Sequence, residues 1–143
     1  AYVRGSCLYV HGGVIGGGCK AGEHAVGLVP GRSGRIENVH DWVAALNDFK
    51  EAQLEDWIRN PSWSGTPQGE APLNPSLPPC SGWKTRDGFV LRGGGQPLQD
   101  YGSPDVGPSV TLGRHLQRNG MPSVVPDAAM QLLNDSGVRR LVV

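Results

Sequence analysis

The chain has 143 residues, in which 13 lysine and arginine residues balance 13 aspartate and glutamate residues. This length predicts one domain, and the balanced charge argues against a nucleic-acid partner or attraction to an anionic membrane. Apolar runs fall far short of the ~20 residues of a membrane span, and three cysteines do not make a disulfide framework. We therefore expect a soluble protein of a reducing compartment, such as the cytoplasm or an organelle stroma or matrix.

The first expected element is a buried strand at residues 7–10, a short apolar run bounded by glycines. His11 and two glycines follow it directly, and a glycine-rich connection continues to the PGRSG sequence at residues 30–34. A histidine among glycines at a strand end raises the question of what chemistry it serves.

Apolar residues recur at three- and four-residue spacing over residues 36–58, which predicts one amphipathic helix or two helices broken near the middle. Asn38 is the expected N-cap, and Pro61 prevents the helix from continuing much further. Trp42 and Trp57 fall on the apolar face, so both are expected in the core.

Residues 60–108 hold most of the prolines and show almost no periodicity. We expect a long irregular loop or insertion that contacts something outside its own core. Regular structure returns with expected helices at residues 110–120 and 127–135 and a strand at residues 138–143. This strand and the one at residues 7–10 are continuous apolar runs, which predicts that they are neighbouring buried strands.

A P-loop and a zinc site are two possible interpretations of the glycine-rich segment near His11, but each lacks part of the sequence pattern that it requires. A phosphate-binding P-loop at residues 13–18 requires a lysine where Cys19 stands. A zinc site built from Cys7, His11, Cys19 and His24 has suitable ligand types, but their spacing differs from that of common structural sites.

An esterase-like α/β hydrolase is a further alternative, because the His-Gly-Gly sequence at residues 11–13 is similar to an oxyanion-hole segment. That fold also needs a nucleophile in a Gly-x-Ser-x-Gly pentapeptide. The two nearest sequences place Arg35 and Thr111 where the last glycine is required, which disfavours this function.

Three stretches carry a resemblance to a known family: LYVHGGV at residues 8–14, VHDWVAAL at residues 39–46 and LLNDSGVRRLVV at residues 132–143. In this order they resemble the C-terminal half of calcineurin-like metallophosphoesterases, particularly the Shewanella-like phosphatase branch. The resemblance implies an α/β fold with part of a metallophosphoesterase-like sheet, flanking helices and a long Pro/Gly-rich irregular segment.

The resemblance also implies a metal-dependent phosphoester hydrolase, of the phosphoprotein-phosphatase kind. His11 would be a metal ligand, in a centre of two divalent ions (Mn, Fe or Zn) that generate a hydroxide nucleophile and neutralise the phosphate. Arg86 or Arg92 would lie near the substrate. No other residue of the family's metal centre matches a position of this chain.

The family's earlier motifs, Asp-x-His, Gly-Asp-x-x-Asp and Gly-Asn-His, are not found in the sequence, and its Gly-His pair would follow Val143. The chain begins at Ala1 without methionine or signal peptide, so we expect a processed protein or part of a longer one. One imidazole cannot hold two metal ions. We therefore expect half an active site, inactive and metal-free alone, whose partners are the remaining half of the domain or neighbouring chains. The alternative is an inactive structural subunit of a larger assembly.

The other histidines, His24, His40 and His115, are expected to be solvated or capping residues.

Overall fold

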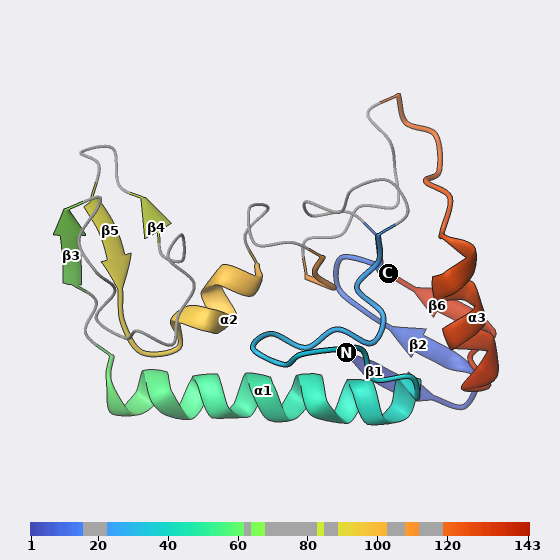
Figure 1. The fold of residues 1–143 in the computed structure, drawn as a ribbon, viewed down its shortest axis with the longest axis horizontal. Helices are drawn as coiled ribbons and strands as arrows, with labels where there is room; N and C mark the ends of the chain where they lie inside the picture. The colour runs from blue at the N-terminus through green and yellow to red at the C-terminus, as the bar shows by residue number, and fades with distance from the viewer. Residues whose placement is uncertain (16–22, 62–63, 68–82, 85–88, 103–107, 112–118) are drawn as a thin grey trace. The chain divides into compact units, whose positions relative to one another are not determined.

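The structure is a computed structural model that describes residues 1–15, 23–61, 64–67, 83–84, 89–102, 108–111 and 119–143 (Figure 1). These residues form a small mixed α/β protein. Two compact units are present, which we call unit 1 (Ala1–Asp48 with Tyr101–Val143) and unit 2 (Phe49–Asp100).

Unit 1 contains a three-stranded sheet made from the two ends of the chain. Its strands are β1 (Tyr2–Arg4), β2 (Cys7–Tyr9) and β6 (Arg140–Val142), in the order β1-β2-β6. β2 pairs antiparallel with β1 and parallel with β6, and the backbone N–H of Val10 donates to the carbonyl of Val142 at 3.0 Å. The prediction that the strands expected at residues 7–10 and 138–143 are neighbours is confirmed by the pairing of β2 with β6 (Figure 1).

The prediction that both of these strands are buried is wrong, because both alternate. In β2, Leu8 has no exposed surface, but Cys7 is half-buried and Tyr9 is 39% exposed. In β6, Leu141 is half-buried, Arg140 is exposed and Val142 is 41% exposed. The reason is that the core covers one face of the sheet, so a continuous apolar run does not imply burial on both faces.

Residues 39–59 form a single helix, α1 (Val39–Arg59). The side-chain Oδ1 of Asn38 accepts hydrogen bonds from the backbone N–H groups of His40 at 2.9 Å and Asp41 at 3.2 Å, which confirms the predicted N-cap. The helix ends before Pro61, as expected from the steric restriction that a proline places on preceding residues. It continues unbroken through its middle.

The core of unit 1 draws its buried side chains from β2, from the first half of α1 and from α3 (Asp127–Asp135), among other segments. Trp42 has no exposed surface, and its indole Nε1–H donates to the carbonyl of Leu28 at 2.8 Å. α3 has the predicted bounds and follows Pro126. The buried apolar side chains of these two helices are Val39, Trp42, Val43, Leu46, Ala129 and Leu133.

Unit 2 contains a second sheet and a short helix. Strands β3 (Ser64–Pro67), β4 (Trp83–Lys84) and β5 (Phe89–Arg92) form an antiparallel sheet in the order β3-β5-β4. α2 (Gln96–Tyr101) follows β5. Within the described part of residues 60–108, backbone pairing between strands creates regular structure that apolar periodicity does not predict. The rest of the expected irregular segment, residues 62–63, 68–82, 85–88 and 103–107, lies outside the described residues.

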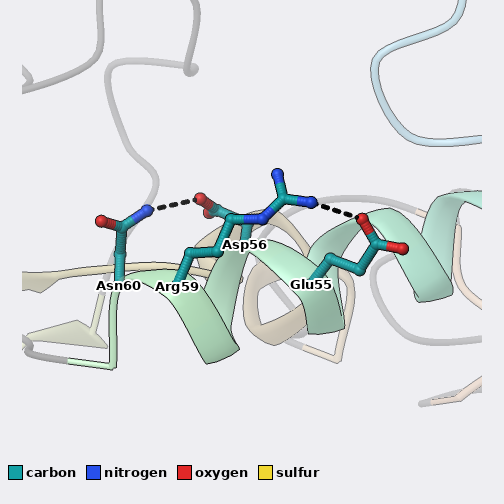
Figure 2. Close-up of polar contacts among 4 residues, drawn as sticks. All are labelled: Glu55, Asp56, Arg59 and Asn60. Carbon is teal, nitrogen blue, oxygen red and sulfur yellow. Dashed lines mark hydrogen bonds and ion pairs between the residues drawn. The ribbon is translucent and has the colours of Figure 1, made fainter.

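The last turn of α1 carries two polar pairs, which Figure 2 shows. Arg59 donates to the carboxylate of Glu55 at 2.9 Å, and both side chains are largely exposed. Such a pair contributes little, about 0.3–0.5 kcal/mol in a helix. The Asn60 amide donates to Oδ1 of Asp56 at 3.1 Å, where the chain leaves the helix.

Asp56 also binds the glycine turn between β5 and α2. Its Oδ2 accepts the backbone N–H of Gly95 at 2.8 Å, while the N–H of Gly94 donates to the carbonyl of Asn60 at 3.2 Å. A Cβ on Gly94 would lie 2.5 Å from the Asn60 carbonyl oxygen. The turn therefore approaches the helix backbone as closely as only glycine permits.

Trp57, near the end of α1, corrects the predicted core. Trp57 is 49% exposed and Ile58 is 71% exposed, although Trp57 continues the apolar spacing of the helix. Helical periodicity identifies an apolar face but not how far tertiary structure covers it. Among the helices of the described ranges, none combines the length and apolar character needed to cross a membrane.

Candidate functional site

His11 lies two residues beyond Tyr9, the last residue of β2, with its side chain exposed. Because β2 and β6 are parallel, their carboxyl ends lie at the same edge of the sheet. Gly12 and Gly13 follow and are buried, and Gly13 has a φ of 96°, a left-handed conformation that favours glycine. The sequence thus places an exposed imidazole on a tightly packed glycine turn.

A second segment, distant in sequence, holds this turn in place. The backbone N–H of Gly12 donates to the carbonyl of Val110 at 2.6 Å. The N–H of Val110 in turn donates to the phenol oxygen of Tyr101 at 3.2 Å, and the Thr111 hydroxyl donates to the carbonyl of Tyr101 at 3.3 Å. We call this chain of contacts from Tyr101 through Val110 to Gly12 the tyrosine clamp.

The tyrosine at the base of the clamp stays neutral. Tyr101 is 8% exposed, and its burial raises the pKa of the phenol, while hydrogen bonds with the Val110 backbone and with Ser109 act in the opposite direction. A neutral phenol keeps its own proton and accepts the Val110 N–H through its oxygen. The clamp therefore keeps its charge state at neutral pH.

The clamp argues against the esterase alternative on two grounds. The N–H of Gly12 is already bonded to Val110, so this amide is not available to stabilise an oxyanion. Ser109 is the serine of GPSVT (residues 107–111), the sequence that places Thr111 where the nucleophile pentapeptide requires its last glycine. It is 1% exposed, and its hydroxyl contacts Thr111 Oγ1 at 2.7 Å and accepts the Thr111 N–H at 3.1 Å. A buried serine bonded in this way is a structural group rather than an accessible nucleophile.

Replacing Tyr101 with phenylalanine tests the clamp. The change leaves the buried Val110 N–H without this acceptor, so we expect stability to fall by about 1–3 kcal/mol. The backbone amide of Gly12 should exchange faster with solvent hydrogen, as measured by NMR. Tyr2→Phe is the matched control, because Tyr2 is 60% exposed and its change should leave Gly12 exchange unaltered. Equal exchange in both variants would contradict the clamp.

His24 corrects the expectation of a solvated or capping histidine, because it is 4% exposed. The Arg35 guanidinium lies 3.1 Å from His24 Nδ1 and donates to the carbonyl of His24 at 3.1 and 3.2 Å and to that of Val26. Since arginine only donates, Nδ1 is the acceptor and the imidazole proton resides on Nε2. Burial, then the charge of Arg35, lowers the pKa of His24, opposed by a backbone hydrogen bond with Val26.

This contact predicts a loss of stability in mild acid. The folded pKa of His24 is below its ordinary value of 6.5, so the unfolded chain binds more protons as the pH falls below that value. The contribution of neutral His24 to the free energy of unfolding is therefore fully present at pH 8 and declines below about pH 6.5. His24→Gln should flatten the fall in melting temperature between pH 8 and 5. His40→Gln, at an exposed histidine, should keep the wild-type slope; identical slopes in the two variants would contradict the assignment.

Of the other residues proposed from sequence, one belongs to unit 2 and three lie outside the described residues. Arg92 is the last residue of β5, in unit 2, whereas His11 belongs to unit 1. Arg86, Cys19 and His115 lie outside the described residues. Sequence reasoning missed the roles of Tyr101 and Arg35, because these roles depend on contacts between residues that are not adjacent in the sequence. The GPSVT sequence, which contains Val110, was the only part of the clamp that the sequence analysis considered.

A metal centre needs more donors than this part of the chain provides. Within the described ranges, no group of three or more histidine, cysteine, aspartate or glutamate side chains could hold a metal ion. His24, one of the weighed zinc ligands, is bonded to Arg35, and Cys7 is a half-buried free thiol. His11 supplies a single imidazole, so the described donor set does not fit a dinuclear centre by itself.

Comparisons with known proteins do not assign a family. No protein-family model, curated protein or solved structure matches the chain. The resemblance to metallophosphoesterases therefore stays a prediction that depends on the quoted residues.

Proposed function

We propose that this chain contributes one edge of the active site of a metal-dependent phosphoester hydrolase, with His11 as a metal ligand. The observation that supports the proposal is the parallel pairing of β2 and β6, which brings the carboxyl ends of these two strands to one edge near His11. In α/β sheets, ligands bind beyond the carboxyl ends of parallel strands.

The surroundings of His11 suit a ligand. Its side chain is exposed, while Gly12 and Gly13 are buried beneath it in the clamped turn. A fixed backbone limits the orientations of the imidazole, and such preorganisation strengthens metal binding. The remaining ligands have to come from residues outside the described ranges.

The partial metallophosphoesterase-like sheet belongs to the same proposal. Along the chain, β2 is followed by α1, then by β3, β4, β5 and α2, and finally by α3 and β6. Apart from the four elements in the middle, this is the order of strand, helix, helix and strand that the resemblance implies. The order of elements supports the proposal without identifying a substrate, so phosphate monoesters are the class to test.

The test uses the full protein encoded by the gene, purified with Mn²⁺ and assayed with p-nitrophenyl phosphate. We expect His11→Ala to lower turnover by about 100-fold or more and to reduce bound metal, because a ligand to the nucleophile-generating ion is lost. The fold should remain intact because His11 is exposed. His40→Ala is the matched control, at another exposed histidine of unit 1, and should keep wild-type turnover.

Two outcomes would contradict the proposal. Metal-dependent turnover that survives His11→Ala would remove His11 from the site. A full protein that binds no divalent metal and has no turnover would favour the structural subunit. For residues 1–143 alone we expect no metal-dependent hydrolysis.

A further inference from the structure

The sheet of unit 1 has one exposed face, and its side chains are ordered in rows by the strand register. Tyr2 pairs with Tyr9 and Tyr9 with Val142; Arg4 pairs with Cys7 and Cys7 with Arg140. Side chains two positions apart on a strand share a face, so these two rows lie on the same side. The row between them, Val3, Leu8 and Leu141, faces the core. We call the side with Tyr2, Tyr9, Val142, Arg4, Cys7 and Arg140 the outer face.

Aromatic rings are exposed on the outer face. Tyr2 is 60% exposed and Tyr9 is 39% exposed. Their ring centroids are 6.3 Å apart and their planes are tilted by 39°, so the two rings do not cover each other in a parallel stack. Flat ring surface therefore stays available to a ligand that can stack on it.

The charge of the outer face has a single sign. Arg4 and Arg140 are exposed at opposite ends of the same row. None of the residues of β1, β2 and β6 is acidic. The zero net charge of the chain, which argues against nucleic acid as a partner, is an average that hides this local positive surface.

We propose that the outer face binds single-stranded nucleic acid, whose bases stack on Tyr2 and Tyr9 and whose phosphates contact Arg4 and Arg140. A single strand offers both of the groups that this face can recognise, exposed aromatic bases and regularly spaced phosphates. The proposal does not depend on the proposed hydrolase function, because it uses neither a metal ion nor His11.

Other occupants fit the outer face less well. A second copy packed face to face would bring arginine rows near each other, with like charges opposed. An acidic peptide would satisfy Arg4 and Arg140 but would leave the exposed rings of Tyr2 and Tyr9 without flat partners. A duplex would present phosphates but keep its bases stacked inside.

The test measures fluorescence anisotropy of labelled ten-nucleotide single strands, RNA and DNA, mixed with the chain in EDTA. We expect binding that weakens with salt, with a slope of log affinity against log salt of about −1.4 for two phosphate contacts. Tyr2→Ala or Tyr9→Ala should weaken binding about fivefold or more, because a stacking surface is lost. Tyr9→Phe keeps the ring and should retain the affinity within about twofold.

Charge variants and controls complete the test. Arg4→Gln and Arg140→Gln should each reduce the salt slope by about 0.7. Arg59→Gln, at an exposed arginine of unit 2, should change neither affinity nor slope. Circular dichroism melting establishes that each variant is folded.

Three results would overturn the proposal. One is an absence of binding at 20 mM salt by a folded chain; another is equal binding of a duplex or of polyglutamate with no effect of the tyrosine changes. The third is dimerisation in light scattering that Tyr9→Ala abolishes, which would assign the face to a second copy. Since EDTA removes metal, none of these results affects the test of hydrolysis, and loss of hydrolysis in His11→Ala leaves this proposal intact.

Discussion

Replacing Trp42 with alanine is expected to lower the free energy of unfolding of unit 1 by about 3–5 kcal/mol. The indole has no exposed surface, and its N–H bonds to the carbonyl of Leu28 at 2.8 Å. Truncation removes apolar contacts and leaves a cavity that the helix and sheet cannot fully close. Because small domains are stable by about 5–15 kcal/mol, urea unfolding followed by circular dichroism should show a large shift.

Two variants give this prediction its controls. Trp57→Ala, on the same helix but at a side chain that is 49% exposed, should shift the unfolding midpoint much less. Trp42→Phe keeps most of the apolar volume and removes the N–H, so it should fall between the wild type and Trp42→Ala. A Trp42→Ala shift no larger than that of Trp57→Ala would contradict the assignment of Trp42 to the core.

Replacing Gly94 with alanine is expected to destabilise unit 2 by about 3 kcal/mol, at the upper end of the usual effect of overpacking. The new Cβ would lie 2.5 Å from the carbonyl oxygen of Asn60 and 2.6 Å from that of Asp56, and neither backbone atom can move without disturbing the end of α1. The backbone amide of Gly95, which donates to Asp56, should lose protection from hydrogen exchange.

Gly120→Ala separates this crowding from ordinary backbone strain. Gly120 has a φ of 79° and open space around its Cβ position, so the change introduces left-handed strain alone, about 1–2 kcal/mol. It lies in unit 1 and should leave Gly95 exchange unchanged. If Gly94→Ala left that amide protected, the close contact between the glycine turn and α1 would be refuted.

Local patterns predicted α1, α3 and β2, because their causes lie within a few residues, but did not predict β1 or α2. Asn38 can cap α1 through its own side chain, and the bounds of α3 follow from Pro126 and the apolar spacing behind it. Burial was harder to predict. Trp57 continues the same apolar spacing as Trp42, but it is 49% exposed. Burial of each side chain depends on which segment packs against its turn of the helix, and spacing along the sequence does not specify that.

The candidate site likewise has one part that the sequence predicted and one part that it did not. A histidine at the end of an apolar run could be placed at a strand end, and His11 lies there. The tyrosine clamp that holds the turn after His11 could not be predicted. Gly12, Val110 and Tyr101 are joined by backbone and phenol hydrogen bonds, which produce no periodic pattern in the sequence. The pairing of β3 with β5 is likewise a property of backbone groups rather than of side-chain alternation.

The sheet of unit 1 also constrains the order in which the chain can fold. Its parallel pairing joins Cys7 to Arg140, so the contact has a very high sequence separation and has to close a loop that contains all of unit 2. Unit 2 is one continuous segment, which can form as soon as it leaves the ribosome. During synthesis we therefore expect unit 2 to be structured first, while β2 keeps an unpaired edge until β6 has emerged.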